Sequence, residues 1–353
     1  MGQRSNGVST NSLRIFAPDD ISVMAGYEPD AIGNSQIYPE ECMAQFGYTY
    51  LPIGYPGGVA GLSELLIVAI QDNTQVEISA PQANTFTLNT WQVYRQDVDA
   101  TGLKVTGSGP LAVFTGVWCG NVKDQGTAYC DTMYEMIQPE STLQTTHIVP
   151  SLFPRVNFLT RVLAAQATPY TVNQYSVGGG VTSESFTLTE RESKDTEYLN
   201  VDAAVVTSQY PVIVGQLGYG GDLDLLNLGD PSLLITPAIA EYTNSYYLFA
   251  PATIGYNRVA IMIAVASDTS GLRLNGAPVT GSDGNVTISL PSGESYRILY
   301  EPLCFGVQRI HHVNEKVRFG VVQYNQQFYR ETASAPRRLY PSQPSSYPTA
   351  VSR

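Results

Sequence analysis

The stretch SGPLAVFTGVWCGNVKDQGTAYCDTMYEMIQP (108–139), followed by THIVPSLF (146–153) and NFLTRVLAAQATPYT (157–171), decides the fold of this chain. Runs rich in Val, Ile, Thr, Tyr and Phe, separated by Gly, Pro, Asn and Asp, predict strands joined by turns. We therefore predict a strand, a loop between two cysteines, a second strand, a short crossing and a third strand.

The rest of the chain repeats this unit in weaker form. The apolar strand PLAVF (110–114) recurs as PVIV (211–214), and related strands occur at 20–24 and 316–321. Pairs of strands also recur, at 48–52 with 65–70, at 147–150 with 160–165, and at 247–251 with 259–265. Self-similarity at a long period is typical of a repeat architecture.

We therefore predict an all-β chain built from about three tandem antiparallel repeats of roughly 100 residues each. The units run approximately over 13–108, 109–209 and 210–330, between a disordered leader (1–12) and a disordered Pro- and Ser-rich tail (331–353). A sandwich-like unit is favoured because β-sandwiches have about 100 residues. A propeller-like arrangement stays open, although its blades usually have about 40–50 residues.

Composition restricts the partners that this chain could bind. Its 353 residues carry a net charge of −12, and only 14% of them are charged. Nucleic acid and anionic lipid are excluded as main partners because binding to phosphates needs clustered Lys and Arg. No apolar run reaches the roughly 18 residues that span a bilayer. The amino terminus, MGQRSNGVSTNS, lacks the apolar core of a signal peptide.

Four cysteines, Cys42, Cys119, Cys130 and Cys304, predict disulfide bonds, because an even count in a weakly charged β-rich chain favours them. Cys119 and Cys130 flank a polar loop between two predicted strands, so we expect these two to pair. Cys42 and Cys304 would then form a second pair. A zinc site is disfavoured because no histidine lies near a cysteine in the sequence.

Other chemistry-bearing residues give no catalytic signature. We find no Gly-x-Ser-x-Gly, HExxH or GxxxxGK[ST] motif, and we expect no enzyme activity, no cofactor and no metal. His311 and His312 are neighbours on a predicted strand and should point to opposite faces. Asp222, Asp224 and Asp230 could bind calcium, but their spacing favours a solvated turn.

A single N-glycosylation sequon begins at Asn285, where Asn285-Val286-Thr287 follows a predicted hairpin turn. It is compatible with secretion and predicts a surface position for Asn285.

The ordered motifs of the chain resemble the amino-terminal domain of the IgG Fc-binding protein family. The resemblance rests on SGPLAVFTG (108–116) and the paired cysteines, then MIQP, THIVPSL and RVLAAQATPYTVN (161–173). Further on it rests on PVIV (211–214), GDP (229–231), ITP (235–237), SGLRLNG (270–276) and the segment 310–324, so that it covers about residues 13–330. The usual secretion signal and accompanying modules of the family are absent here, which suggests a fragment or a truncated start.

The resemblance implies an extracellular protein of mucus, secretions or matrix that contacts proteins or glycans without catalysis. We therefore expect a secreted, non-enzymatic adhesion or mucus-matrix binding module. The 23 tyrosines support binding surfaces, because tyrosine offers large contacts at low entropy cost. The alternative is an extracellular structural subunit that self-assembles through sheet edges or disulfides. An intracellular enzyme, the least favoured interpretation, would keep free thiols.

Overall fold

The computed structural model describes residues 6–10, 12, 23–25, 38–40, 46–56, 63–123, 131–220, 231–250, 257–327 and 330–334. These residues form antiparallel strands and three short 3-10 helices, η2 (Glu140–Thr142), η3 (Ile239–Glu241) and η4 (Ala266–Gly271). The predicted all-β fold class is confirmed.

The strands fall into three successive groups, which we call the first, second and third units. The first unit is an eight-stranded sheet of β1 (Gly7–Ser9), β4 (Gly47–Tyr50), β5 (Ser63–Ala69), β6 (Thr74–Ile78), β7 (Asn84–Leu88), β8 (Val93–Asp97), β9 (Val105–Gly120) and β10 (Asp131–Ile137). The second unit is a seven-stranded sheet of β11 (Gln144–Pro150), β12 (Phe158–Ala164), β13 (Thr168–Ser176), β14 (Val181–Leu188), β15 (Ser193–Tyr198), β16 (Val201–Gly218) and β17 (Ser232–Ile235).

The third unit contains two sheets. The four-stranded one has β18 (Ser245–Ala250), β24 (Gly306–His312), β20 (Leu272–Leu274) and β21 (Ala277–Pro278). The five-stranded one has β22 (Gly284–Ser289), β23 (Ser295–Pro302), β19 (Asn257–Val265), β25 (Gly320–Gln327) and β26 (Arg330–Ser334). A separate pair joins β2 (Val23–Ala25) to β3 (Tyr38–Glu40).

The three units share one pairing order. In the first unit, β4 and β6 pair with the first half of the long strand β9, whereas β5 and β10 pair with its second half. In the second unit, β11 and β13 pair with the first half of β16, and β12 and β17 pair with its second half. In the third unit two separate strands, β24 and β25, take the places of the first and second halves of the long strand. Strands β18 and β20 pair with β24, whereas β19 and β26 pair with β25.

The long strands β9 and β16 each join two parts of a unit, and they include the residues at which the approximate unit boundaries were expected. Each contains a proline near its middle, Pro110 or Pro211, close to a shift in register against its neighbour strand. A strand that bends from one sheet layer into another does so at such irregularities, where a proline without an N–H is tolerated. The expected boundaries at 108/109 and 209/210 therefore fall inside continuous strands.

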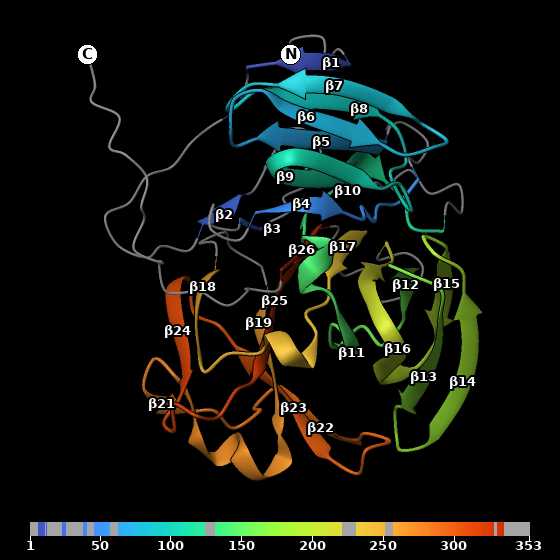
Figure 1. The fold of residues 1–353 in the computed structure, drawn as a ribbon. Coiled ribbons are helices and arrows are strands. Elements are labelled where there is room, and N and C mark those ends of the chain that lie inside the picture. The colour runs from blue at the N-terminus through green and yellow to red at the C-terminus, as the bar shows by residue number, and fades with distance from the viewer. Residues whose placement is uncertain are drawn as a thin grey trace.

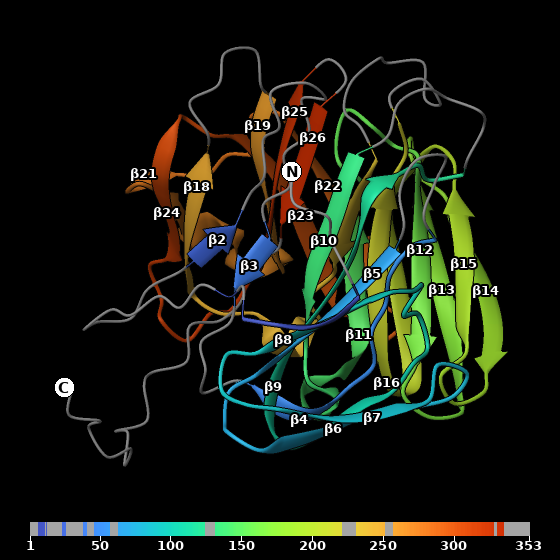
Figure 2. The same cartoon turned by 90° about the horizontal axis from the view of Figure 1, so that it is seen from above.

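Four strands, one from each unit and one from the amino-terminal pair, meet at the centre of the molecule (Figure 1). Strand β10 contacts both β3 and β17, and β26 contacts β17 and β3 as well. Seen from above, the second and third units stand side by side with their strands roughly aligned (Figure 2). The arrangement holds the units in fixed positions around these central strands.

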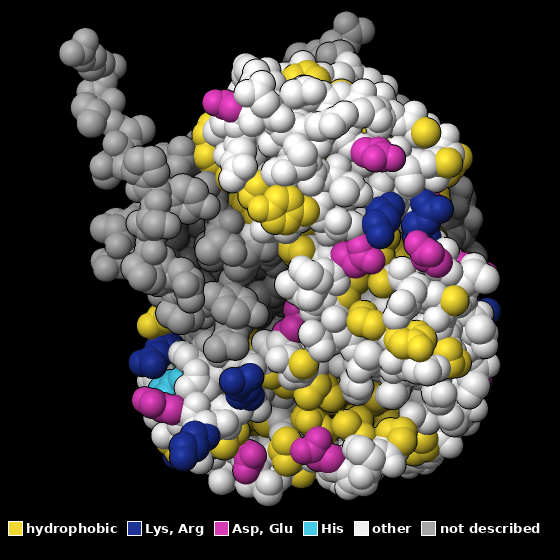
Figure 3. Space-filling view, in the orientation of Figure 1, with side chains coloured by type: hydrophobic (Ala, Val, Ile, Leu, Met, Phe, Trp, Pro, Cys, Tyr) yellow, Lys and Arg dark blue, Asp and Glu magenta, His cyan; other side chains and the backbone are white. Residues whose placement is uncertain are grey.

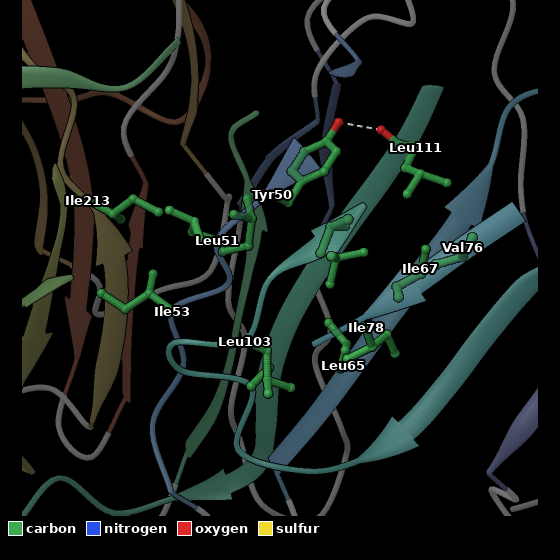
Figure 4. Close-up of a cluster of buried hydrophobic side chains, with 14 of the residues drawn as sticks. Tyr50, Leu51, Ile53, Leu65, Ile67, Val76, Ile78, Leu103, Leu111 and Ile213 are labelled. Atoms are coloured by element: carbon green, nitrogen blue, oxygen red, sulfur yellow. Dashed lines mark hydrogen bonds between the residues drawn. The ribbon is translucent and has the colours of Figure 1, made fainter. Parts of the chain in front are cut away.

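Each unit has its own buried core, and the cores continue across the contacts between units. Leu51 and Ile53 of the first unit extend toward Ile213 of the second unit, and all three belong to one cluster (Figure 4). A second cluster joins Ile148, Ala203 and Val205 of the second unit to side chains of the third, which include Ile261, Ile263, Ile298 and Val322. Apolar burial therefore stabilises the contact between neighbouring units.

Candidate binding face

The register of the strands places Tyr50, His147 and Tyr246 at equivalent positions. Their partners across the first neighbour strand are Val105, Val206 and Ile310, respectively. All three side chains are buried. This alignment allows the outward face of each unit to be compared residue by residue.

The two tyrosines make the same hydrogen bonds to the main chain. The hydroxyl of Tyr50 accepts a bond from the N–H of Gly47 (2.8 Å) and donates to the carbonyl of Leu111 (Figure 4). The hydroxyl of Tyr246 accepts from the N–H of Thr243 (3.0 Å) and donates to the carbonyl of Phe319 (2.7 Å). Each tyrosine thus ties its first strand to the middle of its unit.

His147 takes the tyrosine position in the second unit. Its Nδ1 lies 3.1 Å from the carbonyl oxygen of Thr236. Burial lowers the pKa of His147 below its ordinary value of 6.5, and the opposing effect of the Glu241 carboxylate and of nearby main-chain groups does not offset it. The second unit therefore holds a neutral imidazole where its neighbours hold a phenol.

We expect the free energy of unfolding to fall as the pH drops below about 6.5. The unfolded chain binds a proton at His147 there, whereas the folded chain resists it, so stability falls by up to about 1.4 kcal/mol per pH unit until the folded pKa is reached. Urea unfolding followed by circular dichroism between pH 5 and 8 measures this slope. His147→Tyr should reduce it more than His311→Gln does, because the His311 imidazole is more exposed. An unchanged slope in His147→Tyr would contradict the assignment.

In the second and third units, the residue after the equivalent position points away from the core of its own unit. What this residue contacts differs between the two units. In the second unit Ile148 lies opposite Val205, and both have no exposed surface. In the third unit the equivalent pair is Tyr247 and Arg309, and the Tyr247 side chain is 46% exposed. The face that binds a neighbour in the second unit is thus exposed in the third.

Tyr247 lies on β18 and Arg309 lies on β24. We call the exposed side of these two strands, together with the turn before β24, the β18–β24 face. Its large exposed side chains are Tyr247 (46%), Phe249 (45%), Phe305 (67%) and Val307 (68%). The Arg309 guanidinium lies 6.0 Å from the centre of the Tyr247 ring. Exposed aromatic and arginine side chains in one apolar patch are typical of protein-binding surfaces.

Two arginines of the third unit lie beside His311 in the four-stranded sheet. Figure 3 shows Lys and Arg side chains beside a histidine at the lower left, over the third unit. Arg273 and Arg309 flank His311 in the sheet. Asp and Glu side chains lie among them in the same view, so this region carries both signs of charge (Figure 3).

The cysteines lie only partly within the described residues. Cys119 takes part in a disulfide bond. Because Cys304 is free, the partner of Cys119 is Cys42 or Cys130, and both of these lie outside the described residues. The pairing of Gly120 with Asp131 brings the ends of β9 and β10 together, as a Cys119–Cys130 bond requires. Because Cys130 lies outside the described residues, this bond stays a prediction. The expected pair Cys42–Cys304 is not formed, because Cys304 is a free thiol in the solvent-exposed turn between β23 and β24.

The remaining expected site residues are placed as follows. Asn285 is exposed on β22, so its glycosylation stays a prediction. His312 is buried while His311 is half-exposed, in agreement with opposite faces. The loop that contains Asp222, Asp224 and Asp230 lies outside the described residues. Among the described side chains, no group of His, Cys, Asp and Glu could hold a metal ion.

The sequence contains a signal for the β18–β24 face that strand propensity does not reveal. Residues 203–206 (AAVV) are apolar throughout, as in a strand buried on both sides. Residues 308–312 (QRIHH) carry polar side chains on the outward side. Only the comparison of equivalent positions shows that the outward side of the third unit is exposed and carries polar side chains beside its apolar ones.

Comparison with known proteins identifies the relatives of this fold. The IgGFc binding protein family profile matches residues 35–325. The chain belongs to the IgGFc-binding protein family. It is 27% identical over 277 residues to the human IgGFc-binding protein, an alignment that covers 73% of this chain and 5% of that much longer protein.

One solved structure is similar over most of the chain but only weakly. It is the viral chemokine binding protein R17 encoded by rodent gammaherpesvirus Peru, with 9% identity and a TM-score of 0.22 over 87% of this chain and 90% of that one. Among the described residues, no helix has the length and apolar character needed to cross a membrane.

Proposed function

We propose that this member of the IgGFc-binding family is a secreted, extracellular, non-enzymatic module that binds proteins or glycans of mucus or matrix. The observation that carries the proposal is the exposure of the β18–β24 face. In the second unit the same face is buried against a neighbouring unit. In the third it presents aromatic, apolar and arginine side chains to solvent. The name of the human relative, which refers to IgG Fc, makes Fc a partner to test.

Biolayer interferometry on immobilised IgG Fc, and separately on immobilised mucin, tests this proposal. We expect binding to at least one of them, with a dissociation constant of micromolar order, because a single patch of this kind supports a transient contact. The matched control is a chain with Phe249→Glu and Val307→Glu, which changes only exposed positions. No binding to either surface, or equal binding by the control, would contradict the proposal.

The second candidate, a self-assembling structural subunit, is favoured by one specific observation. The free Cys304 thiol lies in the turn beside Phe305, at the end of a face of the type that holds two units together. An intermolecular disulfide there would join two chains.

Size-exclusion chromatography with light scattering, with and without reductant, separates the two candidates. We expect a monomer of 38.3 kDa in both conditions if the chain acts as a binding module. A dimer that disappears with reductant and in Cys304→Ser would instead support self-assembly. The Ser variant is conservative in size, so loss of the dimer would reflect the missing thiol.

A further inference from the structure

A hollow of about 420 Å³ lies at the polar end of the β18–β24 face. It is lined by Asn244, Ser245, Arg309, His311, Val313 and Glu315, with His312 beneath them. Its volume is within the range of small-molecule sites. The hollow is therefore large enough for a compact ligand next to the exposed ring of Tyr247.

The positive charges at this hollow have no compensating carboxylate in ion-pair contact. Among the residues that the structure describes, the ion pairs include neither Arg273 nor Arg309. Arg273 donates to the carbonyls of Ser270 (2.9 Å) and Leu272 (2.8 Å), so it is fixed in place and contributes mainly its charge. The Arg309 Nε lies 3.5 Å from the hydroxyl of Ser245, a weak contact that leaves the guanidinium able to bind a ligand.

The two histidines have different bonding. His312 is occupied, because its Nε2 lies 2.7 Å from the carbonyl of Asp268 and its Nδ1 lies 3.0 Å from that of Asn314. His311 lines the hollow, and its Nδ1 is shielded from solvent without a hydrogen-bond partner. Such an unpaired polar atom calls for an explanation, and a ligand, ion or water in the hollow would supply the missing hydrogen bond.

Burial and the neighbouring cations shift the pKa of His311 in the same direction. Partial burial and the positive charges of Arg309, Arg273 and His312 lower the pKa of His311. Glu315 lines the hollow with an opposite charge, and Lys316 follows it in the chain. A bound anion would offset the repulsion among the cations and favour the protonated imidazole.

We propose that this hollow binds a sulfate or carboxylate group carried on a sugar ring. Arg309 and protonated His311 would give charge-assisted hydrogen bonds to the anionic oxygens. Asn244 and Ser245 would bond to ring hydroxyls, and the exposed Tyr247 ring would pack on the sugar. A single charge on an otherwise neutral sugar is favoured over an acidic peptide, because Glu315 and the net charge of −12 repel a polyanion.

This inference rests on the proposed function and deepens it, since it names the glycan chemistry that the β18–β24 face would recognise. Isothermal titration with galactose-6-sulfate, galactose and inorganic sulfate at pH 6.0 and 7.5 tests it. We expect galactose-6-sulfate to bind at least about tenfold more tightly than galactose, and more tightly at pH 6.0, because protonation of His311 adds a charged donor. NMR titration of the imidazole should show the pKa of His311 rising in the complex.

Two variants make the test specific. Arg309→Gln should weaken binding of galactose-6-sulfate at least about tenfold, the loss expected for one charge-assisted contact. Arg297→Gln on β23, outside the hollow, should leave binding unchanged. Thermal unfolding of each variant checks that the fold is retained.

Several outcomes would overturn the inference. Equal binding of galactose would exclude recognition of the charge, and unchanged binding by Arg309→Gln would exclude this hollow. Inorganic sulfate that binds as tightly as the sugar sulfate would indicate an adventitious ion only. A glutamate-rich peptide that binds more tightly than the sugar sulfate would identify a peptide site instead. Binding to Fc or mucin, measured in parallel, would show whether the proposed function stands when this inference fails.

Discussion

Replacing Val205 with arginine is expected to lower the free energy of unfolding by about 4 kcal/mol or more, because it places an unpaired charge in the contact between the second and third units. Val205 has no exposed surface and belongs to the cluster that joins these units. A loss of this size is a large fraction of the 5–15 kcal/mol that stabilises an ordinary domain.

The reverse exchange at the equivalent position supplies the matched control. Arg309→Val should change the free energy of unfolding by less than about 0.5 kcal/mol, as for most surface substitutions. Urea unfolding at pH 7.5, followed by far-UV circular dichroism, compares the midpoints of both variants with that of the parent chain. Similar midpoints for the two variants would show that the second and third units do not present equivalent faces.

The strand content could be predicted from the sequence because burial leaves a direct mark on residue type. The apolar run 62–70 predicts a strand buried on both faces, and β5 (Ser63–Ala69) has most of its side chains buried. The sequence does not reveal that the segments on either side of Pro110 and Pro211 are continuous strands. Proline lacks the N–H of a ladder hydrogen bond and normally interrupts a strand, and here each proline lies close to a shift in register against a neighbour strand.

The binding face could not be predicted from its own residues. The segment YLFA (247–250) has the composition of an ordinary half-buried strand, and so does the equivalent segment that begins at Ile148. Whether the outward side chains meet another unit depends on the order of the units around the central strands, which local sequence does not encode. The disulfide pairing has the same difficulty, since the free thiol of Cys304 reflects its position in an exposed turn.

Replacing Phe249 with glutamate is expected to weaken binding of the chain to its protein partner at least about hundredfold, which corresponds to about 2.7 kcal/mol. Phe249 and Val307 lie opposite each other in the register and are both well exposed, so they form the apolar centre of the β18–β24 face. A charge there would be buried without a partner in the complex. Because the side chain is exposed in the free chain, the thermal midpoint should hardly change.

Tyr247→Ala and Tyr210→Ala give the sharpest comparison, because both remove an exposed tyrosine of similar accessibility. Tyr247 (46% exposed) lies on the β18–β24 face, whereas Tyr210 (41%) lies on β16 of the second unit. Interferometry should show about a tenfold larger dissociation constant for Tyr247→Ala and no change for Tyr210→Ala. The reason is that interface tyrosines often contribute more than about 1 kcal/mol to binding. If Tyr210→Ala weakens binding as much, or Phe249→Glu does not weaken it, the partner contacts another surface. If only the Phe249 and Tyr247 variants lose binding, the partner contacts the β18–β24 face. The third unit would then bind a partner with the face that, in the second unit, packs against the neighbouring unit.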